Sequence, residues 1–179
     1  MTSIFLVGPM GSGKSTVGRA LARRIKFQFI DSDREIEQRC GVDIPTIFDY
    51  EGEQGFRDRE ERVIDELTQL PGIVLATGGG SVLRQISRDR LNSRGCVILL
   101  EVDLDEQWRR VGMDPNRPLL NTKNPEERLR NLMKERQPIY QSVAHITVST
   151  DSSRMHNVVN RIMRQVQRHK IQLKSPTEL

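Results

Sequence analysis

A glycine-rich segment near the N-terminus has the residue types and spacing that hold the phosphate chain of a nucleotide. The pattern GxxxxGK[ST] is matched at every fixed position by Gly8-Pro9-Met10-Gly11-Ser12-Gly13-Lys14-Ser15. Glycines let backbone N–H groups surround phosphate oxygens, Lys14 can reach the β- and γ-phosphates, and Ser15 offers a hydroxyl to Mg²⁺. Glycine-rich turns also occur for packing reasons, but the apolar run before this one and the helix-forming residues after it favour nucleotide binding. The segment does not identify the phosphate acceptor.

Two carboxylates follow the second strand-like run, in Asp31-Ser32-Asp33. Side chains two residues apart at a strand end can divide two tasks. Asp31 would hold Mg²⁺ through its water shell, while Asp33 would orient or deprotonate an acceptor hydroxyl. The same three residues are also a common helix cap, so the pattern alone leaves both interpretations open.

Two arginines have the chemistry to bind a carboxylate on the acceptor. Arg57 lies three residues before Glu60 in a helix-forming segment, so an ion pair would hold its guanidinium in place, although a surface salt bridge has the same spacing. Arg136 lies in a later helix-forming segment. Because a guanidinium binds a carboxylate through two parallel hydrogen bonds, the two arginines together favour a carboxylated substrate.

Three consecutive glycines, Gly78, Gly79 and Gly80, follow the third strand-like run. Glycine costs backbone entropy in regular structure, and its presence makes sense where a ligand approaches the main chain closely. A flexible turn is the alternative. The position directly after a strand favours a ligand-binding loop.

A loop with two prolines carries one arginine, in the sequence Asp114-Pro115-Asn116-Arg117-Pro118-Leu119-Leu120. A lid that brings Arg117 to the transferring phosphate would exclude water and stabilise negative charge. An exposed arginine on an ordinary loop is the alternative. We expect the lid to occupy about residues 112–124.

Short apolar runs alternate with helix-forming segments along the chain. Several of the strand-like runs are continuously apolar, as in parallel strands that are covered on both faces. The alternation predicts a three-layer α/β domain with a mainly parallel sheet, and it places the residues above near the carboxyl ends of the strands. The strand-like runs are 4–7, 27–30, 73–76, 97–100 and 146–148, and the helical segments include 15–25, 44–50, 53–70 and 125–143, the last with Asn124 as its expected N-cap.

The composition is that of a soluble globular domain. The chain has 179 residues, 36% of them hydrophobic and 29% charged, with no apolar run long enough to cross a membrane and no secretory signal pattern. Cys40 and Cys96 lack the spacing of a metal site, and free thiols suit a reducing cytoplasm.

The net charge of +4 belongs to the C-terminal segment. Residues 152–179 contain six Lys or Arg and one acid, whereas the rest of the chain has 22 basic and 23 acidic residues. Val158, Ile162 and Val166 recur there at four-residue intervals, which predicts an amphipathic helix. A solvated basic face explains this charge more simply than a nucleic-acid site does.

Taken in order, these segments resemble the shikimate kinase family. The resemblance covers about residues 4–150 and implies a P-loop kinase fold, with a five-stranded parallel sheet of order 2-3-1-4-5, helices on both faces and a lid. We expect a single domain over residues 1–168, followed by a flexible tail at 169–179 that lies outside the resemblance. The matching segments are the phosphate loop, Asp31-Ser32-Asp33, the Gly-Glu-x-x-Phe-Arg segment ending at Arg57, the three glycines, Arg117-Pro118-Leu119-Leu120 and the segment from Arg136 to Tyr140.

The resemblance also implies a reaction and its residues. ATP would phosphorylate the 3-hydroxyl of shikimate, giving shikimate 3-phosphate and ADP in chorismate and aromatic amino acid biosynthesis. Residues 152–154 align poorly with the family's pattern, so the adenine contact is not assigned. The implied residues are Gly11, Ser12, Gly13, Lys14, Ser15, Thr16 and Arg117 for ATP, Ser15 and Asp31 for Mg²⁺, Asp33, Arg57, Gly79 and Arg136 for shikimate, and Lys14, Asp33 and Arg117 for catalysis.

Two other functions remain open from the residues alone. Kinases for gluconate or a nucleoside monophosphate share the phosphate loop; an aromatic content of 4% offers little surface for base stacking, but gluconate also carries a carboxylate. A nucleotide-dependent module whose basic tail binds nucleic acid is an alternative of a different class. The complete order of acceptor residues favours shikimate kinase, acting as a cytoplasmic monomer without a membrane or nucleic-acid partner.

Overall fold

A five-stranded parallel sheet forms the centre of the protein. The structure, a computed structural model, describes residues 2–112, 117–151, 154–171 and 173. Neighbouring strands pair in parallel in the order β2-β3-β1-β4-β5, which confirms the sheet that the family resemblance implied. The strands are β1 (Ser3–Val7), β2 (Gln28–Asp31), β3 (Ile73–Ala76), β4 (Gly95–Glu101) and β5 (Ile146–Ser149).

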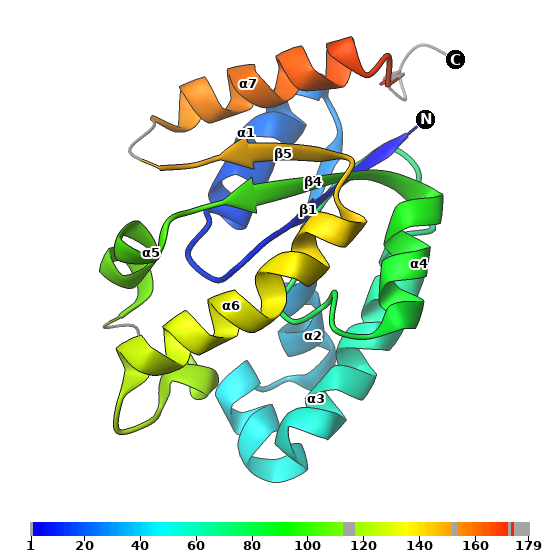
Figure 1. Cartoon of the computed structure of the whole chain (residues 1–179). Coiled ribbons are helices and arrows are strands. Elements are labelled where there is room, and N and C mark those ends of the chain that lie inside the picture. The colour runs from blue at the N-terminus through cyan, green and yellow to red at the C-terminus, as the bar shows by residue number, and fades with distance from the viewer. Residues whose placement is uncertain (1, 113–116, 152–153, 172, 174–179) are drawn as a thin grey trace.

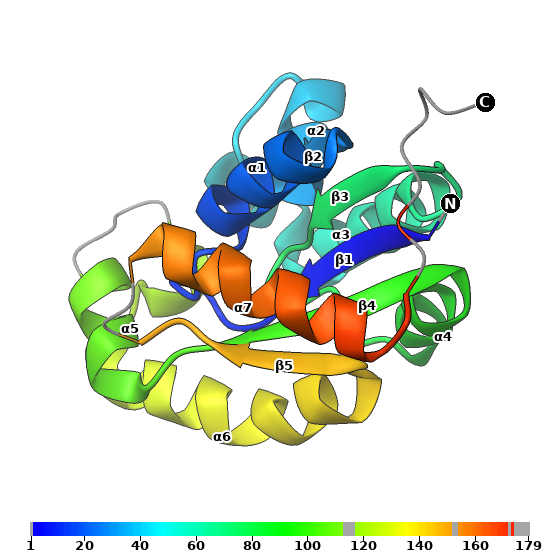
Figure 2. The ribbon, with the colours of Figure 1, turned by 90° about the horizontal axis from the view of Figure 1, so that it is seen from above.

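Helices cover both faces of the sheet. They are α1 (Lys14–Ile25), α2 (Ser32–Cys40), α3 (Ile44–Leu67), α4 (Gln85–Arg94), α5 (Leu104–Val111), the 3-10 helix η1 (Pro118–Leu120), α6 (Pro125–Val143) and α7 (Met155–Arg168). In Figure 1 the sheet lies between α1 and α7 on one side and α3, α4 and α6 on the other. Figure 2 shows α7 lying along the β5 side of the sheet. The alternation of strand residues builds both cores, because Ile4 and Leu6 of β1 pack toward α1 and α7, while Phe5 and Val7 pack toward the opposite layer.

The central strand β1 carries the phosphate loop at its carboxyl end. Its neighbours β3 and β4 are reached by crossovers on opposite sides of β1, so the strand order reverses there. Ligand sites of open parallel sheets lie at such a reversal. Gly8 ends β1 with φ of 140°, and a Cβ at this position would collide with the carbonyl oxygen of Leu100. The chain therefore turns from strand to loop only with glycine at this position.

The two helices expected at residues 44–50 and 53–70 are both present, and they meet at a kink at Gly52 (φ 69°, ψ −178°) within α3. This conformation is open to glycine alone, so the helical backbone is interrupted at Gly52. The second helix ends at Leu67, before the expected end at residue 70. Asn124 is the N-cap residue of α6, as expected, but its side chain makes no cap hydrogen bond; its amide group donates to Glu127 instead.

The C-terminal helix α7 confirms the amphipathic pattern in the basic segment. Val158, Ile162 and Val166 are all buried against α1 and the sheet. Its exposed arginines include Arg164 and Arg168. Most of the expected tail (residue 172 and residues 174–179) lies outside the described residues. Across the part of the chain that the structure describes, no helix combines the length and the apolar character that a membrane span requires.

Candidate active site

The phosphate loop joins β1 to α1 and surrounds a polar cavity. Lys14, the first residue of α1, folds back over the loop and donates from Nζ to the carbonyl oxygens of Gly8 and Pro9, both at 2.8 Å, and more weakly to Ser12 Oγ at 3.4 Å. The pKa of Lys14 is lowered to about 8, chiefly by burial; the carboxylate of Asp33 opposes this shift, and the guanidinium of Arg117 adds to it. The cavity wall includes Gly11, Gly13, Lys14, Ser15, Thr16, Asp31, Asp33 and Arg117.

Ser15 and Asp31 lie together at the floor of this cavity. Ser15 Oγ donates to Asp31 Oδ2 at 2.5 Å. The other oxygen of Asp31 accepts from the backbone N–H of Asp33 at 3.1 Å and of Arg34 at 3.4 Å, so it caps α2. The structure therefore confirms the helix cap, while the other oxygen of Asp31 faces the phosphate loop and its metal role stays a prediction. A hydroxyl beside a carboxylate is an oxygen donor set that fits Mg²⁺.

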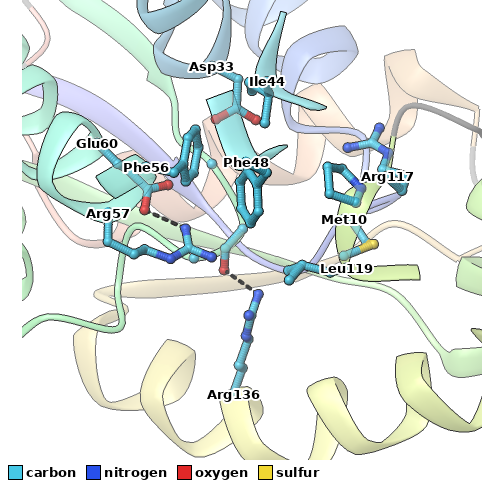
Figure 3. Close-up of a pocket in the computed structure, with 14 residues that line it drawn as sticks. Met10, Asp33, Ile44, Phe48, Phe56, Arg57, Glu60, Arg117, Leu119 and Arg136 are labelled. Carbon is cyan, nitrogen blue, oxygen red and sulfur yellow. Dashed lines mark hydrogen bonds and ion pairs between the residues drawn. The ribbon is translucent and has the colours of Figure 1, made fainter. Parts of the chain in front are cut away.

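A second cavity adjoins the first on the side of α3 and α6 (Figure 3). Charged side chains form part of its wall, and apolar side chains of α3 and η1 form much of the rest. The charged residues are Asp33, Arg57, Glu60, Arg117 and Arg136; the apolar ones include Ile44, Phe48, Phe56 and Leu119. A small ring with an anionic group and hydroxyls matches such a wall.

Arg57 is held rigidly at the edge of this cavity. It is buried, with 8% of its surface exposed, and its guanidinium pairs with Glu60 at 2.6 Å and Glu53 at 3.0 Å. The guanidinium also lies over the ring of Phe56, 5.2 Å from its centre. The ion pair with Glu60 confirms the helical spacing, but it is not the surface salt bridge that was the alternative. The buried carboxylate of Glu60 and the exposed one of Glu53 keep the arginine charged and oriented toward the cavity.

Asp33 lies between the two cavities. One carboxylate oxygen, Oδ1, is buried and accepts no hydrogen bond from any described residue. The pKa of Asp33 is raised to about 7, chiefly by burial and also by the neighbouring carboxylates of Glu60 and Asp31. Such a group can accept a hydrogen bond, or a proton, from a hydroxyl at neutral pH.

The three glycines let charged side chains approach the end of β3. A Cβ on Gly78 would meet Glu60 and Asp33 Oδ1, and a Cβ on Gly80 would collide with the guanidinium of Arg57. The sequence predicted that a ligand approaches the main chain closely at these glycines; in the structure the protein's own side chains also do so. The carbonyl oxygen of Gly79 accepts from Tyr140 and, at 3.5 Å, from Arg136.

Four residues border both cavities and so mark where phosphate and acceptor meet. They are Met10, Asp33, Gly79 and Arg117. In Figure 3 Arg117 stands across the cavity from Arg57, while Arg136 reaches in from α6. Of the expected lid, residues 113–116 lie outside the described residues, and Leu120 packs against α6. The structure therefore places Asp33, Arg57, Gly79, Arg117 and Arg136 around one space.

Sequence reasoning missed Arg110, which lies beside the phosphate loop. Its guanidinium donates to the carbonyl oxygen of Gly11 at 2.9 Å and that of Thr150 at 3.0 Å. A third cavity lies there, between the loop and the start of α7, and Ser12 and Met155 also line it. The sequence contains no signal for this site, because Arg110 lies four residues after Glu106, the spacing of an ordinary surface ion pair. That pair does form, at 2.7 Å.

Comparison with known proteins shows the family of the chain. Residues 10–167 match the family described as shikimate kinase. The shikimate kinase of Vibrio cholerae is 52% identical over 167 residues, which cover 93% of this chain and 96% of the relative. That of Actinobacillus pleuropneumoniae is 54% identical over 161 residues, covering 90% and 93%.

Solved structures agree with this assignment. The shikimate kinase from Acinetobacter baumannii in complex with shikimate has a TM-score of 0.93 and 45% identity, with 96% of each chain covered. A gluconokinase from Sinorhizobium meliloti has a TM-score of 0.56 at 14% identity, over 94% and 93% of the chains, and so shares the fold alone. The chain therefore belongs to the shikimate kinase family and is an ATP-dependent small-molecule kinase.

Proposed function

We propose that the protein transfers the γ-phosphoryl group of ATP to the 3-hydroxyl of shikimate, giving shikimate 3-phosphate and ADP for chorismate and aromatic amino acid synthesis. The observation that carries the proposal is the pair of adjoining cavities, one built by a phosphate loop and the other by two arginines and Asp33. The Acinetobacter baumannii relative, solved in complex with shikimate, supports this choice of acceptor.

In the proposed complex Arg57 and Arg136 bind the carboxylate of shikimate. Both are buried, and in Figure 3 they approach the cavity from α3 and α6 respectively. The backbone of Gly79 contributes on the same side, and Asp33 receives the ring hydroxyl. The apolar residues Phe48 and Leu119 pack against the ring, which places the reacting oxygen toward the phosphate loop.

ATP lies along the phosphate loop in this proposal. Backbone N–H groups from Gly11 to Thr16 surround the phosphates, and Lys14 exchanges its loop carbonyl partners for phosphate oxygens. Ser15 and Asp31 would hold Mg²⁺, which when bound offsets negative charge on the phosphates. The cavity beside Arg110 is the place for the adenine ring, because the guanidinium offers a flat cationic surface next to Gly11.

Transfer proceeds in line from ATP to the acceptor oxygen. Phosphoryl transfer has a loose transition state, so positioning and charge stabilisation outweigh strong base catalysis. Asp33 orients the hydroxyl and takes its proton as the new P–O bond forms and the bond to ADP breaks. Lys14 and Arg117 stabilise charge on the transferring group and on ADP. The positions of Asp33 and Arg117 at the border of both cavities, and of Lys14 in the wall of the phosphate cavity, support these roles.

We extend the proposal to the organisation of the chain. Residues 1–168 form one kinase domain with a lid at about 112–124, and the protein works as a cytoplasmic monomer. The family match over residues 10–167 supports the domain bounds. Size-exclusion chromatography with light scattering measures the oligomeric state directly, and a dimer mass would contradict this extension.

An acceptor panel tests the function. Release of ADP is measured with ATP and Mg²⁺ plus shikimate, gluconate or a nucleoside monophosphate, with each component omitted in turn. We expect turnover only when ATP, Mg²⁺ and shikimate are all present. A clear preference for another acceptor would reject shikimate as substrate. Steep salt-dependent binding of duplex nucleic acid that is lost on deleting the residues after 167 would favour the nucleic-acid module instead.

Replacing Arg136 with lysine should raise the KM for shikimate about tenfold and leave kcat within about threefold. Lysine keeps the charge but loses the forked pair of donors, which costs about 1–2 kcal/mol for a carboxylate ligand. Steady-state kinetics with each substrate varied would separate the two constants. Arg130→Lys is the matched control, because Arg130 lies on the same helix with its side chain 64% exposed. A fall in kcat with an unchanged KM would remove Arg136 from carboxylate binding.

The pH dependence of kcat/KM should have an acidic limb near pH 7 and a basic limb near pH 8. The pKa of Asp33, raised to about 7, means that the carboxyl is protonated and cannot accept the hydroxyl proton below neutral pH. The pKa of Lys14, lowered to about 8, means that its charge is lost above pH 8, which weakens ATP capture. We expect the acidic limb in kcat/KM for shikimate and the basic limb in kcat/KM for ATP. A flat profile between pH 5 and 9 would contradict both assignments.

A further inference from the structure

Tyr140 makes a contact at the candidate site that none of the proposed roles uses. It lies on α6, one helical turn after Arg136, with its ring in the core layer and 2% of its surface exposed. Its hydroxyl donates a short hydrogen bond to the carbonyl oxygen of Gly79. The same oxygen is 3.5 Å from Nη1 of Arg136, at the outer limit of a hydrogen bond. One glycine carbonyl thus connects a buried tyrosine to a proposed substrate arginine.

Hydrogen bonds to the carbonyl groups of this loop set the direction of its N–H groups. The carbonyl oxygen of Gly78 accepts from the backbone N–H of Ser81 at 3.2 Å and from its hydroxyl at 2.8 Å. In a trans peptide the C=O and the following N–H point in opposite directions, and the described residues contain no cis peptide. The N–H groups of Gly79 and Gly80 therefore point away from Ser81 and Tyr140. Neither has an acceptor among the described residues, and both glycines line the acceptor cavity.

We propose that Tyr140 is a positioning residue for shikimate binding: it holds the Gly79 carbonyl so that the adjacent backbone N–H groups and the guanidinium of Arg136 serve the substrate carboxylate. This inference rests on the proposed function. Two successive N–H groups form an anion-binding concavity only while the peptide planes are held. Without the phenol, the nearest side-chain donor to this carbonyl is Arg136, which would then turn from the carboxylate to the loop.

A purely structural explanation makes a different prediction. A buried tyrosine needs a hydrogen-bond partner, and the carbonyl of Gly79 supplies one whatever the loop does. In that case loss of the hydroxyl would lower stability and leave substrate constants unchanged. Burial raises the pKa of Tyr140 to about 12, so the phenol remains a donor across the working pH range in either case. The two explanations therefore differ in substrate recognition and not in protonation.

Tyr140→Phe removes the hydroxyl and keeps the ring. We expect the KM for shikimate to rise about tenfold, with kcat and the KM for ATP within about twofold of the unsubstituted protein. With shikimate methyl ester, which lacks the negative charge, the substitution should change KM less than about twofold. Tyr50→Phe is the matched control, because Tyr50 is 87% exposed and should leave every constant unchanged.

An unchanged KM for shikimate in Tyr140→Phe, or an equal change with shikimate and its ester, would overturn the positioning role. If the unsubstituted protein shows no turnover that depends on shikimate, the proposed function itself fails, and this inference fails with it. Amide NMR of the ligand-free proteins gives a readout that needs no activity: the Gly79 and Gly80 signals should shift or broaden in Tyr140→Phe. Unchanged signals would also reject the role.

A second measurement covers the case in which Tyr140→Phe does not fold. Tyr50 and Tyr140 are the two tyrosines of the chain, so uniform labelling with 3-fluorotyrosine gives two ¹⁹F signals. The buried one should shift when shikimate is added and shift less with the methyl ester. A ¹⁹F signal of Tyr140 that does not shift at a saturating concentration of shikimate would overturn the inference.

Discussion

Asp33→Asn should lower kcat about a thousandfold, an increase of roughly 4 kcal/mol in the activation barrier. Asparagine has nearly the same shape, but its amide cannot take the proton of the acceptor hydroxyl and presents a donor on one side. The buried oxygen Oδ1, which accepts nothing from the described protein, is the atom that we expect to face this hydroxyl. Single-turnover measurements with preformed ternary complex would isolate the chemical step from product release.

The same substitution should stabilise the ligand-free protein at alkaline pH. The pKa of Asp33 is raised from 3.8 to about 7 by burial, so the folded state disfavours the charged form. The contribution of this raised pKa to the free energy of unfolding is fully present below about pH 4 and is lost as the pH rises through 7. Asp33→Asn should therefore have a higher melting temperature than the unsubstituted protein at pH 8, and this difference should vanish near pH 4. For the kinetic prediction, near-normal kcat in Asp33→Asn would show that Asp33 has no catalytic role.

Arg117→Ala should lower kcat about a thousandfold with a smaller change in the KM for shikimate. An arginine that stabilises the charge of a transferring phosphoryl group contributes a factor of about 10³ or more to kcat. Arg117 is placed for this, because it borders both cavities together with Asp33. The effect belongs to the transition state, since the charge on the bridging oxygens grows as the bond to ADP breaks. Rapid-quench kinetics would measure the chemical step.

A conservative variant and a control variant accompany this prediction. Arg117→Lys keeps a cation without the fork and should recover part of the lost rate. Arg109→Ala removes an arginine from α5 whose side chain is 73% exposed and should leave kcat unchanged within about twofold. If Arg117→Ala raised only the KM for ATP, the arginine would be a binding residue and not a catalytic one.

Much of the fold follows from local patterns in the sequence. Short apolar runs predicted all five strands, and the observed bounds differ from the expected ones by no more than two residues. The strand order came from the family resemblance, because pairing between distant strands leaves no mark in local periodicity. The glycine between two helical patterns was also interpreted correctly, since the non-helical backbone of Gly52 separates the two parts of α3.

The residues around the acceptor cavity were predicted in part. Asp33 stands out because it follows a strand, and Arg57 and Arg136 stand out because arginines suit a carboxylate. All three border one cavity in the structure. Arg110 and Tyr140 did not stand out. Arg110 has the spacing of a surface ion pair, and it does pair with Glu106. Tyr140 has the spacing of a core residue, and its ring does pack in the core. Their other contacts join segments far apart in the chain, which spacing cannot show.

A crystal structure with MgADP and shikimate would show whether the two adjoining cavities bind both substrates for in-line transfer. We expect the carboxylate of shikimate on Arg57 and Arg136, its 3-hydroxyl within hydrogen-bond distance of Asp33, and the metal beside Ser15 and Asp31. The 3-oxygen should face the β-phosphate across the space that Arg117 borders. Shikimate bound in the reverse direction, with its carboxylate toward Lys14 and its 3-hydroxyl away from Asp33, would rule out this arrangement.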